Sequence, residues 1–100
     1  MSVNLWWRFN DGMTGHVWLG EREVHALQQE MMLQGMAEAF PVDKLAPQTG
    51  DERRQVAPQE IEAALEVASE EPTQLEDAKL WHDWLAFLDG ARHKGGLLVR

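Results

Sequence analysis

The side chains best suited to metal binding or acid–base chemistry are histidines that follow a carboxylate at helical spacing. Glu21 precedes His25 by four residues, and Asp89 precedes His93 by the same interval. Residues four apart share one face of a helix, so each pair offers a metal ion two ligands. Neither pair belongs to a His-Glu-x-x-His zinc motif, and an exposed ion pair explains the same spacing. We therefore predict no metal site and no cofactor, with Glu21, His25, Asp89 and His93 as the candidates if a metal is bound.

Nucleophilic catalysis has little support in the sequence. The chain contains no cysteine, and none of its few serines and threonines lies in a Gly-x-Ser-x-Gly turn. Gly95 and Gly96 follow a predicted helix and precede a predicted strand, which reverses the order found in phosphate-binding loops. The sequence therefore predicts a protein that is not an enzyme.

Two adjacent tryptophans near the N-terminus give the clearest indication of a binding surface. The segment NLWWRF alternates as a half-buried strand does, so Leu5, Trp7 and Phe9 share one face and Trp6 and Arg8 share the other. We expect the first face to enter the core. The second face then holds a tryptophan that the strand itself does not bury.

A turn and a return strand are predicted next. Residues 10–12, Asn-Asp-Gly, tolerate the backbone of a tight reversal, and residues 16–19 alternate again. If the residue numbers of each cross-strand pair add up to an even number, the apolar side chains of both strands lie on the same face of the sheet. This register places four candidate binding residues on the face that points away from the helices: Trp6, Arg8, His16 and Trp18.

These four side chains permit more than one interpretation. An exposed apolar patch with tryptophan and arginine is typical of protein interfaces. The same group suits a stacking site for a small ligand. Two structural alternatives stay open: residues 41–57 cover the face, or the register slips by one and Trp18 packs in the core.

Apolar residues at helical spacing predict three helices. They cover residues 20–40, 58–71 and 74–94. Glu23 is placed to accept the Gly20 amide, and Pro41 ends the first helix. Thr73 and Glu76 form a capping box at the start of the third helix, whose broad apolar face predicts that it is the most buried.

The predicted order is β-β-α-α-α-β. We expect one α+β domain over residues 1–100, in which an N-terminal β-hairpin and a C-terminal strand form a small antiparallel sheet packed on one face by three helices. Residues 41–57 contain two prolines and no clear period, which predicts an exposed loop.

Charge and composition limit the classes of partner. The formal net charge is −8, and residues 51–83 contain ten acidic and three basic side chains. Such a field repels nucleic acid and anionic membranes and attracts basic proteins. The absence of cysteine, of a signal peptide and of a long apolar run favours a soluble, cytoplasmic protein.

The leading hypothesis is a non-enzymatic protein–protein interaction module, acting as a homo-oligomer such as a homodimer or on a basic partner. In composition the chain resembles the immunity proteins that neutralise toxins, since both are small, acidic α+β domains with tryptophan. That resemblance covers no motif, and it implies a basic protein partner. The alternative hypothesis is a small-ligand-binding or regulatory domain that uses the aromatic residues of the sheet. A metal-dependent enzyme is the third.

Overall fold

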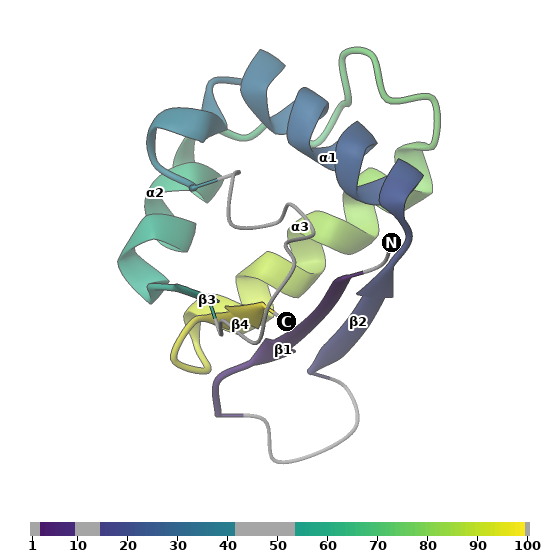
Figure 1. Ribbon diagram of the computed structural model, residues 1–100. Coiled ribbons are helices and arrows are strands. Elements are labelled where there is room, and N and C mark those ends of the chain that lie inside the picture. The colour runs from purple at the N-terminus through teal and green to yellow at the C-terminus, as the bar shows by residue number, and fades with distance from the viewer. Residues whose placement is uncertain (1–2, 10–14, 42–53, 100) are drawn as a thin grey trace.

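The computed structural model describes residues 3–9, 15–41 and 54–99 and confirms the α+β class (Figure 1). The predicted hairpin, three helices and C-terminal strand all form in the predicted order, and one short strand is added. The elements are β1 (Val3–Trp7), β2 (His16–Leu19), α1 (Glu21–Leu33), the 3-10 helix η1 (Met36–Glu38), β3 (Arg54–Val56), α2 (Pro58–Val67), α3 (Ala78–Arg92) and β4 (Leu97–Val99). The predicted turn at residues 10–12 lies outside the described residues.

The four strands form an antiparallel sheet in the order β2-β1-β4-β3. Val3 pairs with Leu19, and Leu5 pairs with Val17 and Val99, so the predicted even-sum register of the hairpin is confirmed. Because alternate residues of a strand point to opposite faces, this register places the paired apolar side chains on one face of the sheet, where they pack into the core. The core face of the sheet consists of Val3, Leu5, Leu19, Val56, Leu97 and Val99, with Val17 partly buried.

Strand β3 corrects the prediction that residues 41–57 are an exposed loop. Arg54–Val56 pairs with β4, and Val56 is only 1% exposed. Three residues are too few for the alternation of a strand to show in a sequence. Residues 42–53 of the predicted loop lie outside the described residues.

Helix α1 is shorter than predicted, because it ends at Leu33 and not at residue 40. Gly35 adopts a left-handed conformation with φ 79°, which only glycine enters without strain, and η1 follows. The turn directs Met36 and Phe40 into the core from the end of the helix. The predicted start of α1 is confirmed, since the Gly20 amide donates to Glu23 Oε1 at 3.0 Å.

Helix α3 begins at Ala78, four residues after the predicted start. Asp77 caps it by accepting the Leu80 amide at 3.0 Å, so the predicted Thr73–Glu76 capping box is wrong. The amide and the hydroxyl of Thr73 instead donate to Glu30 on α1. Helix α2 also stops early, at Val67 rather than residue 71.

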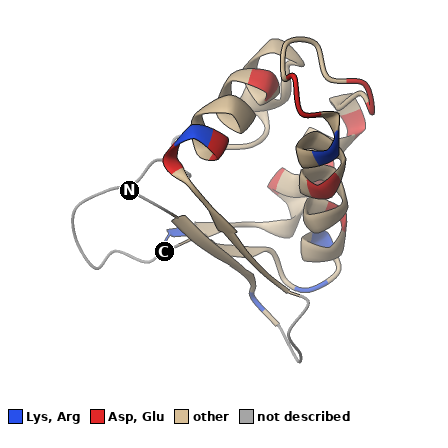
Figure 2. Cartoon of the chain, turned by 90° about the vertical axis from the view of Figure 1, so that its right-hand side faces the viewer, with Lys and Arg blue, Asp and Glu red and all other residues tan. Residues whose placement is uncertain are grey.

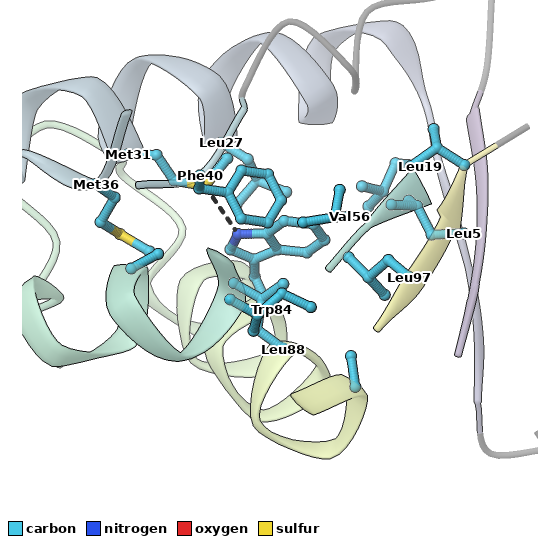
Figure 3. Close-up of a cluster of buried hydrophobic side chains, with 14 of the residues drawn as sticks. Leu5, Leu19, Leu27, Met31, Met36, Phe40, Val56, Trp84, Leu88 and Leu97 are labelled. Carbon is cyan, nitrogen blue, oxygen red and sulfur yellow. Dashed lines mark hydrogen bonds between the residues drawn. The ribbon is translucent and has the colours of Figure 1, made fainter. Parts of the chain in front are cut away.

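Helix α3 supplies much of the core, as predicted. Trp81, Trp84 and Leu88 are buried, and the indole of Trp84 lies between α1 and the sheet with its Nε1 donating to Met31 (Figure 3). Trp7 also packs inward as predicted. Its indole lies so close to Gly90 that a Cβ there would overlap the ring, and its Nε1 donates to the Phe87 carbonyl at 3.0 Å.

Candidate interaction surface

The face of the sheet opposite the helices carries no formally charged side chain among the strand residues. Figure 2 shows the sheet as one layer and the helices as a second layer on one side of it. We call the outward side chains of the four strands the outer sheet face. They are Asn4, Trp6, His16, Trp18, Gln55 and Leu98. The structure therefore brings three of the four candidate residues, Trp6, His16 and Trp18, to one face.

Trp6 lies in the middle of this face and packs against its neighbours. Its ring stacks on His16 with 4.8 Å between centroids and 21° between planes, and Leu98 pairs with it from the other side. His16 Nε2 lies 3.0 Å from Asn4 Oδ1, a hydrogen bond that holds the imidazole in place. Trp6 is half-buried in this arrangement.

Trp18 is the exposed aromatic residue of the outer sheet face. It pairs with Asn4 from the edge strand β2, and 57% of its surface is exposed. A tryptophan this exposed leaves a large apolar area in water, which burial against another surface would remove. Of the two tryptophans that sequence reasoning assigned to this face, Trp18 is therefore the stronger anchor for an interface.

Arg8 does not join the other three candidates. It follows β1, its amide donates to the Gly96 carbonyl at 2.9 Å, and its guanidinium lies 5.4 Å from the ring centroid of Phe9. Phe9 was predicted to enter the core, but it is 64% exposed. Its amide donates to the Lys94 carbonyl just beyond the sheet, and its ring lies close to Gly95. The stacking site of four side chains that the ligand hypothesis requires is not preformed.

The metal candidates are placed on the helices. Glu21 and His25 lie on α1, and the Asp89 carboxylate accepts a 2.8 Å hydrogen bond from Arg92 near the end of α3, where His93 is the C-cap. Within the described ranges, no group of three or more His, Cys, Asp or Glu side chains is arranged to hold a metal ion. Neither pair gains a third ligand there.

Charge is separated between the two layers (Figure 2). The strands with their flanking residues, 3–9, 15–20, 54–57 and 93–99, contain three basic side chains and no carboxylate. Residues 21–41 and 58–92, which form the helical layer, contain thirteen carboxylates and three basic side chains. Among the described residues, the negative charge therefore lies in the helical layer.

One carboxylate of that layer is buried, and sequence reasoning missed it. Glu30 on α1 is 1% exposed and accepts hydrogen bonds from the amides of Thr73, Gln74 and Leu75 at 2.7–3.0 Å. The Thr73 hydroxyl and the side-chain amide of Gln34 donate to it as well. Burial raises the pKa of Glu30, but these hydrogen bonds outweigh burial and lower its pKa to about 2. Glu30 thus holds the segment between α2 and α3.

None of the helices in the described part of the chain is long and apolar enough to cross a membrane. The chain matches no protein-family model, no curated protein and no solved structure.

Proposed function

We propose that this protein is a non-enzymatic interaction module of the cytoplasm that forms a homodimer through its outer sheet face. The observation that carries the proposal is the exposure of Trp18 on an uncharged sheet face that none of the described helices covers. Tryptophan is among the residues that contribute most to binding at protein interfaces. The absence of cysteine suits a reducing compartment.

Charge favours a second copy as the occupant. Each molecule has a formal net charge of −8, and the helical layer holds all the described carboxylates, so two copies that meet through their helices repel each other. The outer sheet face lacks formal charge, so two copies that meet through it keep their carboxylates farther apart and repel each other less than copies that meet through their helices. A twofold axis would place the same patch on both sides, as homodimers require.

The size of the face predicts a weak dimer. Four strands at a spacing of about 4.8 Å and about four residues long cover roughly 250 Å². Standard interfaces bury about 800 Å² per partner, so we expect a dissociation constant in the high micromolar range.

Sedimentation equilibrium from 10 µM to 1 mM tests the proposal. We expect the average mass to rise toward the dimer with concentration in the wild type, and to stay at the monomer in Trp18→Ser. Met32→Ser is the matched control, because Met32 is 59% exposed on α1, outside the proposed interface. A wild type that stays monomeric at 1 mM, or equal losses in both variants, would refute the homodimer.

A further inference from the structure

The helical layer contains a second surface with the geometry of a binding site. An open groove of about 440 Å³ runs between α1 and residues 74–80. Ala26 lines it from α1, and Leu75 and Leu80 line it from the opposite wall. Its volume is within the range of about 300–1,000 Å³ that is common for ligand sites, and these three side chains give it an apolar part.

The length of the groove suits an extended peptide. Its α1 wall reaches from Arg22 to Glu30, nine residues that span about 12 Å along the helix axis. An extended chain rises about 3.3 Å per residue, so about four residues match this wall. An open groove of this length can hold a short extended peptide segment along its whole α1 wall.

The second wall of the groove is fixed before any ligand arrives. Glu30 accepts the backbone amides of Thr73, Gln74 and Leu75, which leaves this segment little freedom to move. Gln34 reinforces the arrangement by donating to Glu30 and to the Glu71 carbonyl. A preorganised wall lowers the entropy lost on binding.

The charges around the groove favour a cationic occupant. Glu23, Glu76 and Asp77 line it, against Arg22 as its one basic residue. Glu30 adds a fourth negative charge, because its hydrogen-bond partners within the described chain are all neutral amides and a hydroxyl. Its pKa of about 2 keeps that charge at neutral pH.

We infer that this groove binds a short, extended, basic segment of a partner protein. One apolar side chain of the segment contacts Ala26, Leu75 and Leu80, and flanking lysine or arginine side chains face Glu23, Glu76 and Asp77. The site is separate from the outer sheet face, so the dimer and this complex can form together. The proposed site gives part of the negative charge of the helical layer a specific role, which is to bind a basic segment.

A titration with synthetic peptides, followed by ¹⁵N NMR, tests the inference. The probe is Ac-Lys-Leu-Lys-Lys-NH₂. Its control, Ac-Lys-Ser-Lys-Lys-NH₂, has the same charge without the apolar side chain. We expect saturable shifts at residues 22–30 and 74–80 with the first peptide, and binding at least about threefold weaker with the second, as the loss of one buried apolar side chain implies.

Three charge variants sharpen the test. Glu76→Gln should weaken binding of the leucine peptide about threefold, and Arg22→Gln should strengthen it by a similar factor. Glu66→Gln is the matched control, because it removes an exposed carboxylate on α2 that does not line the groove. It should change the affinity much less than Glu76→Gln.

Three results would overturn the inference. The first is the absence of shifts at millimolar peptide. The second is a set of shifts spread evenly over the carboxylates of the helical layer. The third is equal weakening by Glu76→Gln and Glu66→Gln, which would mean that the peptide responds to net charge alone.

Discussion

Glu30 is the buried carboxylate of the described helical layer. Its buried carboxylate links the last turn of α1 to the backbone of residues 73–75, more than forty positions away in the sequence. A buried charge is costly unless hydrogen bonds compensate it, and here neutral donors supply the compensation. In the sequence Glu30 is one of seventeen acidic residues, and nothing local distinguishes it. Its role follows only from the long-range packing of α1 against the segment before α3.

We predict that Glu30→Gln destabilises the fold in a pH-dependent way. The folded-state pKa of about 2 lies below the ordinary 4.5, so the ionised carboxylate stabilises the fold above pH 4.5, and that contribution is lost as the pH falls toward 2. Glu30→Gln should lower the free energy of unfolding by about 3 kcal/mol at pH 7, and this deficit should shrink by about 2 kcal/mol at pH 3. Urea unfolding at both pH values measures the difference. A deficit of the same size at pH 3 and pH 7 would contradict the assignment.

We also predict that Trp18→Ser leaves stability nearly unchanged. Its ring is largely exposed and packs against little of the core, so the free energy of unfolding should fall by no more than about 0.5 kcal/mol. Thermal unfolding of a dilute, monomeric sample measures this. A loss of several kcal/mol would show that Trp18 supports the fold and would remove the basis for an interface.

At the scale of elements, alternation predicted the hairpin well and local capping signals predicted helix ends less well. The register of β1 and β2 follows from the apolar parity of Leu5, Trp7, Val17 and Leu19, because only one parity buries them all. Thr73 and Glu76 have the spacing of a capping box. The amide and the hydroxyl of Thr73 instead donate hydrogen bonds to Glu30, and Asp77 caps α3. Phe9 has the same parity as the core residues of β1, but it lies beyond the end of that strand, so its parity does not predict burial.

The strand that the sequence did not predict also depends on a long-range contact. Gly96 precedes β4 with φ 94°, and a Cβ at this position would overlap the Val56 carbonyl of β3. The close approach of β3 and β4 therefore requires glycine there. One apolar residue in Arg54–Val56 leaves no pattern from which this pairing could be deduced.

We predict that Gly96→Ala is far more destabilising than Gly35→Ala. Both glycines have positive φ, but a Cβ at Gly35 meets nothing within 4 Å. Gly35→Ala should cost about 1 kcal/mol from backbone strain alone, and Gly96→Ala about 3 kcal/mol, because it also forces β3 away from β4. Urea unfolding followed by tryptophan fluorescence gives both values. Similar losses for the two variants would show that the contact with β3 contributes little.

At the scale of the whole molecule, the two layers have different chemistry. The helical layer has the described carboxylates and the groove, and the sheet layer presents an uncharged aromatic face. Net charge and its concentration in residues 51–83 can be counted in the sequence, but the separation of charge between layers emerges only when the strands assemble from both ends of the chain. The candidate residues Trp6, His16 and Trp18 could be assigned to one face by parity, whereas Gln55 could not, since its strand was not predicted.

This separation predicts how salt affects self-association. Two molecules of net charge −8 repel at long range, and added salt screens that repulsion while leaving contacts between uncharged faces intact. The dissociation constant of the dimer should therefore fall when NaCl is raised from 50 to 500 mM. Sedimentation equilibrium at the two salt concentrations measures it, and a dimer that weakens with salt would point to an interface built on ion pairs.

The indole N–H signals of the five tryptophans are the most direct test of a homodimer that forms through the outer sheet face. The indole groups of Trp7, Trp81 and Trp84 donate inside the fold, to the Phe87 carbonyl, the Ser69 carbonyl and the Met31 sulfur. Trp6 and Trp18 lie on the outer sheet face. In ¹⁵N NMR spectra at protein concentrations from 20 µM to 1 mM, we predict that the Trp18 signal shifts most and that the Trp6 signal shifts with it. The signals of the three internal indoles should stay in place. Five signals that stay fixed over this range, or shifts confined to the helical layer, would contradict it.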